Sequence, residues 1–364
     1  MRAARGAAEG MKILDRHIAL HVLGFSAVVG LALMALQSFV TLATEADDIG
    51  GNFGFFELVL VVVMQTPAIL LVLLPIIALI GTLLGLGALA QQGEIVAMRA
   101  AGVSVLRIGA ATLGAGLVLG ALALLLTDVV APAGERGAER LKSEARYGTD
   151  PGAVVRPVWL RSGNQIYHIR RVENPRHVEA VTVYSMDGES GLDSVAEVGS
   201  ARFMDGGWRA EDVRVTRLDA EGATRESIDS LRWEDGPQPD VLQLVVLESD
   251  TLSIRGLYRL IDYLQANGLD AQQHRLAFWQ KLVSPLTVLV MMLLAVPYVL
   301  GSLRDSGAGQ RLLVGVLIGV AFWVGNELVI SSALIYRWPP LPSALAPSVV
   351  VLLIALWRLR GARG

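Results

Sequence analysis

Six long apolar runs, separated by polar segments, set the organisation of this 364-residue chain. About 20 apolar residues are needed to cross the hydrocarbon layer of a bilayer. By this measure we expect membrane-spanning helices at about residues 18–43, 58–90, 108–131, 277–300, 312–335 and 343–358. The second run is longer than one crossing needs and contains Pro67 and Pro75, so we expect it to tilt, to kink or to begin in the interface.

A different pattern fills the long segment between the third and fourth runs. In "VWLRSGNQIYHIRRV", "EAVTVYSMDG" and "ARFMDGGWRAEDVRVTRLD", apolar and polar residues alternate between Gly, Asp, Asn and Pro. Period two with turn residues at this spacing predicts antiparallel strands in a sandwich or jelly roll. The stretch "SIRGLYRLIDYLQANG", residues 253–268, then predicts a short helix that begins after a capping serine. We therefore divide the chain into residues 1–131, 132–275 and 276–364.

The composition agrees with a membrane protein and excludes several classes of function. Hydrophobic residues make up 53% of the chain and charged residues only 18%. The balance of 31 basic and 34 acidic residues gives no overall positive field for nucleic acid. The absence of cysteine excludes disulfides, thiolate metal sites and cysteine nucleophiles.

The distribution of Lys and Arg beside the spans predicts the orientation. One set of span ends is basic, with Lys12, Arg16, Arg99, Arg107, Arg304, Arg311, Arg358, Arg360 and Arg363. The other set carries Glu45, Asp47, Asp48 and Asp128 beside Arg337. Because basic residues are retained in the cytoplasm, we expect both termini inside and the β-domain outside.

Between spans two and three, the stretch "LGLGALAQQGEIVAMRAAGVS" changes from apolar to polar. Residues Glu94, Ile95, Met98, Ala101 and Gly102 recur at helical spacing and predict a short amphipathic helix with an exposed acid. Such a helix suits a groove on another protein, and it could equally lie on the membrane surface. The segment "GLGALA" has the letters of a dinucleotide fingerprint, but it lies at a membrane-helix end and predicts helix packing instead. Glycines four residues apart also predict close helix packing, at Gly81 and Gly85, Gly116 and Gly120, and Gly315 and Gly319.

The residues give no warrant for an active site or a metal site. The P-loop motif for nucleotides does not occur. His17 and His21 are the one pair of histidines at helical spacing, and we interpret them as interfacial residues because no nearby acid has an obvious metal-ligand geometry. Glu327 is the one clear ionisable residue inside a span, where such groups are expensive and usually functional. It could face a polar cavity, pair across an interface or lie near the outer headgroups.

Several stretches together resemble the lipopolysaccharide export permease family, and LptG more than its paralogue LptF. They are "LDRHIALHVLG", "LLGLGALAQQGEIVAMRAAGVS", "DVVAPAGERGAERLKSEARYG", "LAFWQKLVSPLTVLVMMLLAVPYVLGSLR" and "RWPPLPSALAPS". The resemblance covers essentially the whole chain and is weakest in the β-domain. It implies an α-helical polytopic protein of the bacterial inner membrane, with six transmembrane helices plus a periplasmic antiparallel β-jellyroll domain. In this family the chain is a permease subunit and not an enzyme.

The resemblance also implies partners and roles. It pairs the chain with an LptF-like sister permease, two LptB-like ATPase subunits that hold the ATP and magnesium, an LptC-like membrane-anchored β-jellyroll protein and an LptA-like periplasmic bridge. Residues 91–104 resemble the coupling helix of the family, with Glu94, Met98 and Arg99 transmitting movement from the ATPase.

For the substrate path, the resemblance places lateral gates on spans one and five, where we select Leu33, Phe39, Phe322 and Glu327. Lipopolysaccharide carries phosphates, for which we select Arg136, Arg140 and Lys142, although acidic residues interleaved with them would also suit a solvated helix. Lysines that some members carry near the outer end of span one are replaced here by Thr41, Asp47 and Asp48. Three alternatives remain open: an LptF-type subunit, a membrane-anchored scaffold, and a secondary transporter, which the near absence of intramembrane charge disfavours.

Overall fold

The computed structural model describes residues 2–46, 50, 53–147, 158–174, 176–187, 191–219, 222–233, 236–239, 242, 252–301 and 306–361. The chain divides into two compact units. The helical unit comprises Met1–Thr44, Gln65–Gly134 and Arg275–Gly364, and the other unit comprises Glu45–Met64 and Glu135–His274. Each unit is described by itself.

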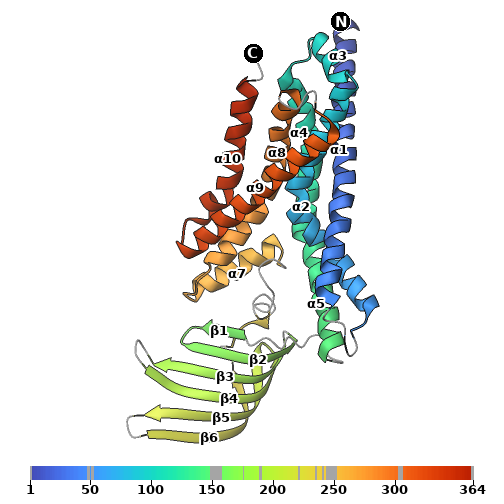
Figure 1. Cartoon of the computed structure of the whole chain (residues 1–364). Helices are drawn as coiled ribbons and strands as arrows, with labels where there is room; N and C mark the ends of the chain where they lie inside the picture. The colour runs from blue at the N-terminus through green and yellow to red at the C-terminus, as the bar shows by residue number, and fades with distance from the viewer. Residues whose placement is uncertain are drawn as a thin grey trace. The chain divides into compact units, whose positions relative to one another are not determined.

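Six helices in the described residues are long and apolar enough to cross a membrane, as predicted. They are labelled in Figure 1 and run over α1 (Arg2–Glu45), α2 (Phe55–Gln91), α4 (Val105–Leu125), α8 (Gln272–Leu300), α9 (Ala308–Ile335) and α10 (Pro340–Gly361). Helix α4 continues through a π-helical turn (Leu126–Val130) into α5 (Ala131–Tyr147). Helix α2 remains one helix through Pro67 and Pro75.

Small residues bring the helices of the helical unit close together. A Cβ added at Gly81 of α2 would lie 2.5 Å from the Ser26 Cα of α1, and one at Gly85 would lie 3.0 Å from the Val22 Cα. Gly315 and Gly319 of α9 similarly contact α2, at Ile80 and Ile76. The pairs Gly81 and Gly85, and Gly315 and Gly319, are therefore packing sites, because a side chain would obstruct this approach. In the third pair an added Cβ would crowd Leu289 at Gly116 but would make only ordinary contact, at 3.6 Å from Pro285, at Gly120.

The second unit contains a six-stranded antiparallel sheet, which confirms the predicted antiparallel β-domain. Its strands follow one another in chain order, as Figure 1 shows. They are β1 (Val158–Ser162), β2 (Gln165–Asn174), β3 (His177–Asp187), β4 (Gly191–Met204), β5 (Gly207–Asp219) and β6 (Gly222–Trp233). One face carries the hydrophobic core of the domain, which includes Tyr167, Val183, Val198 and Trp208.

A short helix follows the sheet in sequence, as the serine cap predicted. Helix α7 (Ile254–Ala266) begins after Ser253, whose hydroxyl accepts a hydrogen bond from the Gly256 N–H. Its Tyr263 hydroxyl donates to the carbonyl of Arg161 on β1 at 2.7 Å. Burial raises the pKa of Tyr263, so the phenol stays neutral and keeps this hydrogen bond.

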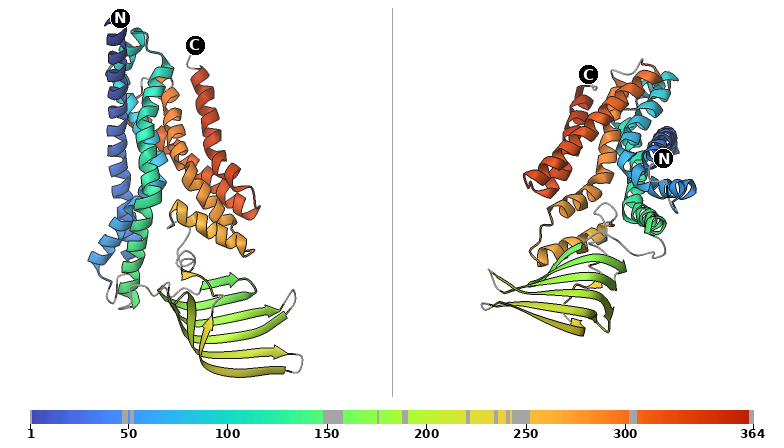
Figure 2. Two further views of the ribbon diagram at one scale, coloured as in Figure 1. Left: turned by 180° about the vertical axis from the view of Figure 1, so that it is seen from behind. Right: turned by 60° about the horizontal axis from the view of Figure 1, so that its bottom comes forward.

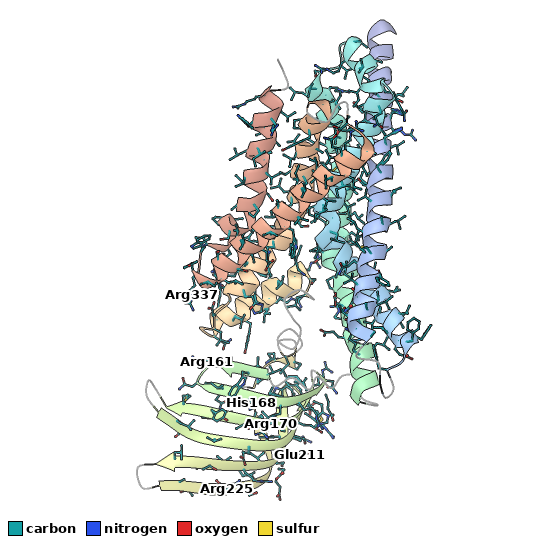
Figure 3. All side chains as sticks on the ribbon, viewed as in Figure 1. Arg161, His168, Arg170, Glu211, Arg225 and Arg337 are labelled. Atoms are coloured by element: carbon teal, nitrogen blue, oxygen red, sulfur yellow. The ribbon has the colours of Figure 1, made fainter. Side chains whose placement is uncertain are left out.

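A crease crosses the sheet along one aligned residue in each of five strands. The register omits the pairs that would join Arg170, Ala180, Gly199, Asp212 and Asp229, while pairing continues on both sides. Ala180 and Asp212 have φ values of 51° and 53°, in the left-handed region. Figure 2 shows the bending of the strands, and Figure 3 labels Arg170 on the crease and Glu211 beside it.

The crease explains why the alternation of apolar residues slips by one position. Beside the crease, buried residues are two apart at Tyr167 and Ile169 in β2, Val181 and Val183 in β3, and Trp208 and Ala210 in β5, but across the crease they are three apart in four strands. The steps are Ile169 to Val172, Val178 to Val181, Val198 to Ala201 and Ala210 to Val213. One extra residue in each strand at the crease keeps the apolar residues on both sides of the crease facing the same core while the strands bend. A β-bulge has the same effect in a single strand.

Candidate functional site

A seven-residue helix, α3 (Glu94–Ala100), joins α2 to α4. It is bracketed by Gly93 and Gly102, whose φ values are 77° and 88°. Such values favour glycine, so the sequence ends the helix at both sides. We expected a helix over about residues 91–104. The observed helix is shorter, because the residues on both sides of it form turns.

The apolar side of α3 faces the helical unit and its other side is open. Ile95 is buried and Met98 is half-buried against the main hydrophobic cluster. Val96, Arg99 and Ala100 are exposed. A cavity of about 360 Å³ adjoins this helix, lined by Ala90, Ile95, Val96, Arg99, Ala100, Val299 and Leu300.

Glu94, the first residue of α3, is held by α1. Its Oε2 lies 2.8 Å from Nε2 of His17. Figure 1 shows α3 beside the N-terminal part of α1. The structure adds to the sequence interpretation a partner for each residue: Glu94, expected to be exposed, is partly exposed and paired with His17. Their separation of 77 positions in the sequence hides the pair from any local pattern.

A second ion pair fixes the same part of α1 to the start of α4. The Arg107 guanidinium donates from Nε and Nη2 to the two carboxylate oxygens of Asp15, at 3.1 and 2.6 Å. This two-point geometry sets the angle between the groups as well as their distance. The N-terminal part of α1 is thus connected to both α3 and α4.

Arg311 was not singled out from the sequence as a structural residue, although it is the largest fully buried side chain in the described part of the chain. It lies in the first turn of α9 against Gly87 of α2. A Cβ at Gly87 would lie 2.6 Å from the Arg311 Cδ. The second glycine of "GLGALA" therefore makes room for an arginine, which agrees with the predicted role in helix packing.

The three residues selected for phosphate lie on α5 with different surroundings. Lys142 Nζ donates to Glu45 Oε1 at 2.7 Å, and both side chains are largely buried. Arg136 is half-buried and Arg140 is exposed. The structure therefore brings an unforeseen carboxylate to Lys142, 97 residues away in sequence. Asp47 and Asp48 lie outside the described residues.

The four residues selected for lateral gates divide into two kinds. Leu33 and Phe322 are half-buried and pack against hydrophobic clusters of the helical unit. Phe39 of α1 and Glu327 of α9 are exposed. Glu327 therefore does not point into a cavity inside this chain.

One group of side chains has the chemistry of a metal site. The ligand atoms of Glu173, His177 and Glu179 lie within 4.8 Å of one another at the turn between β2 and β3. All three already have a partner, since His177 Nδ1 contacts Glu173 and Arg171 donates to Glu179. We expected no metal, and sequence spacing gave no sign of this cluster because a hairpin turn creates it.

Comparison with known proteins shows similarity along nearly the whole chain. Residues 16–361 match the family model of the lipopolysaccharide export system permease LptF/LptG. The LptG permease protein of Escherichia coli strain K12 is 30% identical over 351 residues, which cover 95% of this chain and 98% of the relative. The LptG protein of Haemophilus influenzae strain Rd is 29% identical over 349 residues, with the same coverage.

Proposed function

We propose a role for each region of the molecule from one premise, which is that the chain belongs to the LptF/LptG family and is a permease subunit of lipopolysaccharide export. The chain is accordingly a multi-pass inner-membrane protein and not itself an enzyme. In the proposed complex, it pairs with an LptF-like permease above two LptB-like ATPases. The ATPases bind the ATP and magnesium, and the termini lie in the cytoplasm.

The proposed coupling element is α3. It is short and bounded by glycines, and it exposes Val96 and Arg99 beside a cavity. This arrangement supports docking of α3 on an ATPase, with Glu94, Met98 and Arg99 at the junction. It is the observation that carries the proposal, because a membrane-anchored scaffold needs no such element.

The proposed lateral gates are α1 and α9. Their most apolar stretches are only 28% and 17% buried within this chain. The exposed side chains include Leu31, Leu36 and Phe39 on α1, and Leu317, Val320 and Trp323 on α9. Poor coverage supports an interface with a sister permease and lipid on these helices. Helix α10 is as poorly covered as α1, at 28%, and the choice of α1 and α9 follows the family resemblance. Leu33, Phe39, Phe322 and Glu327 remain the proposed gate residues.

The proposed phosphate site lies on α5, at Arg136, Arg140 and Lys142. Glu45 already neutralises Lys142, so a phosphate would have to replace this carboxylate. Phosphate accepts several charge-assisted hydrogen bonds, which makes that exchange chemically reasonable. The six-stranded sheet is proposed to lie in the periplasm as part of a β-jellyroll, where an LptC-like protein and an LptA-like bridge would receive the lipid.

The test is gentle detergent extraction of the tagged full chain, followed by mass spectrometry of proteins and lipids that co-purify. We expect an ABC ATPase, a second six-span permease and lipopolysaccharide. If the chain emerges alone, under conditions that keep another ABC complex of the same membranes intact, the proposed assembly is wrong.

A second experiment tests the gates, and it uses the absence of native cysteine. A single cysteine at exposed Leu317 should cross-link to the sister permease through a short bifunctional reagent. The matched variant Leu83→Cys places the thiol on a fully buried position of α2 and should not react. If cysteines at positions 317 and 83 cross-link to the sister permease to the same extent, the proposed interface on α9 is wrong.

A further inference from the structure

The pair between His17 and Glu94 is the contact in the described chain from which we draw a new role. It joins the first residue of α3 to the N-terminal part of α1 at 2.8 Å. The side chains are 41% and 35% exposed, so the pair is accessible to water and not part of the core. A partly exposed pair of this kind contributes little to stability. We therefore look for its role in the connection that it makes between α3 and α1.

We propose that His17 is a positioning residue that passes the movement of α3 to α1 through Glu94. This inference rests on the proposed function, in which an ATPase moves α3 and α1 forms a lateral gate. It adds His17 to the proposed mechanism and specifies how movement passes from α3 to α1. Glu94 then has two tasks, because it stands next to the ATPase surface and also binds the helix that must respond.

The backbone around α3 gives a directional side-chain connection a role beside the packing of Ile95 and Met98. Gly93 and Gly102 have left-handed φ values at its two ends, and glycine gives these turns little resistance to rotation. A displacement of α3 could therefore be lost in the turns before it reached α2 or α4. The His17–Glu94 hydrogen bond bypasses both turns.

Helix α1 can transmit a displacement that reaches its N-terminal part. It is continuous from Arg2 to Glu45, and a helix of this length moves as a nearly rigid element. The ring of His17 is also supported. His21 Nδ1 donates to the His17 carbonyl at 3.1 Å, and the two ring centroids are 4.3 Å apart. This neighbour limits the orientations in which Nε2 of His17 can meet Glu94.

The Asp15–Arg107 pair provides a matched control. It also holds the N-terminal part of α1, its side chains are 35% and 40% exposed, and its shortest N–O distance is 2.6 Å. It differs in one respect, since it binds α4 and does not touch α3. Breaking it loosens α1 to a similar extent without cutting the proposed path.

The experiment uses the whole transporter, purified through a tag on this chain and reconstituted in lipopolysaccharide-containing liposomes. Four forms are compared: the wild type, His17→Leu, His17→Gln and Asp15→Leu. Three quantities are measured: the ATPase subunit recovered, the rate of ATP hydrolysis, and the lipopolysaccharide released per ATP hydrolysed. The glutamine amide nitrogen reaches about as far as Nε2 of histidine, so this variant can restore the hydrogen bond to Glu94.

We expect His17→Leu to recover the ATPase normally but to release at least about fivefold less lipopolysaccharide per ATP, the lower end of typical coupling between sites. His17→Gln should recover most of this ratio, and Asp15→Leu should keep it. The inference is overturned if His17→Leu keeps the ratio, if it loses the ATPase, or if Asp15→Leu is equally impaired. A wild type that binds no ATPase and releases no lipopolysaccharide would instead reject the proposed function.

Discussion

Helices α2 and α8 differ from α1 and α9 in how much of each is covered by the rest of the chain. The most apolar stretches of α2 and α8 are 61% and 56% buried, against 28% for α1 and 17% for α9. Their mean hydropathies overlap, with 2.8 and 2.2 for the first pair and 2.2 and 2.0 for the second. Hydropathy therefore identifies a span without saying whether lipid or protein will surround it.

The difference comes from close-packing positions and not from apolar content. Gly81 and Gly85 let α1 approach α2 along one side only, and the other side of α1 keeps large residues such as Leu31 and Phe39 exposed. Lipid tails are as apolar as leucine, so exposure of these residues is not costly in a bilayer. The exposed sides of α1 and α9 can therefore face lipid or another protein chain.

The largest expected difference in stability is between two leucine-to-alanine variants, one on the well-covered helix α2 and one on the poorly covered helix α9. Leu83 of α2 is fully buried, and Leu83→Ala should destabilise the protein by about 2–5 kcal/mol through lost contacts and a cavity. Leu317→Ala on the exposed side of α9 should cost less than about 0.5 kcal/mol. Thermal unfolding of the detergent-solubilised protein measures both, and similar losses would show that α9 is covered.

A smaller effect is expected from adding a single methyl group to a glycine. In Gly81→Ala the new Cβ meets the backbone of Ser26, so α1 must shift, at a cost of about 1–3 kcal/mol. Gly325 of α9 has no atom within 4 Å of such a Cβ. Gly325→Ala should leave the melting temperature unchanged or raise it, because alanine favours helix by about 1 kcal/mol. A marked loss at Gly325 would contradict the comparison.

The smallest effect concerns a hydrogen bond within the well-packed side. The Thr287 hydroxyl of α8 lies 2.8 Å from the Ser348 hydroxyl of α10, and both residues are buried. Thr287→Val keeps the shape of the side chain and should destabilise by about 0.6 kcal/mol, the average for such bonds in membrane proteins. A Ser348→Ala variant and the double variant complete the cycle, and additive losses would mean that the two hydroxyls do not interact.

Much of the helical architecture could be predicted because each span carries its own signal. The fourth run was expected at residues 277–300, and α8 begins earlier, at Gln272, since a helix can continue beyond the hydrocarbon layer on polar residues. Helix α3 was predicted too long because glycines, and not periodicity, set its ends.

The partners of the candidate site could not be predicted in the same way. Glu94 with His17, and Lys142 with Glu45, are joined across 77 and 97 residues by helix packing. No local spacing encodes such contacts. The crease is an intermediate case: the step of three between Val178 and Val181 is visible in the sequence, but its meaning depends on the same step in neighbouring strands.

That shared step places a constraint on how the sheet can change during evolution. Loss of Ala180 alone would turn one end of β3 over, so that its apolar residues faced away from the core while those of its neighbours did not. We therefore expect insertions and deletions at the crease to be tolerated only when adjacent strands change together, whereas the loops at the strand ends should vary independently. The lengths of neighbouring strands are therefore expected to change together.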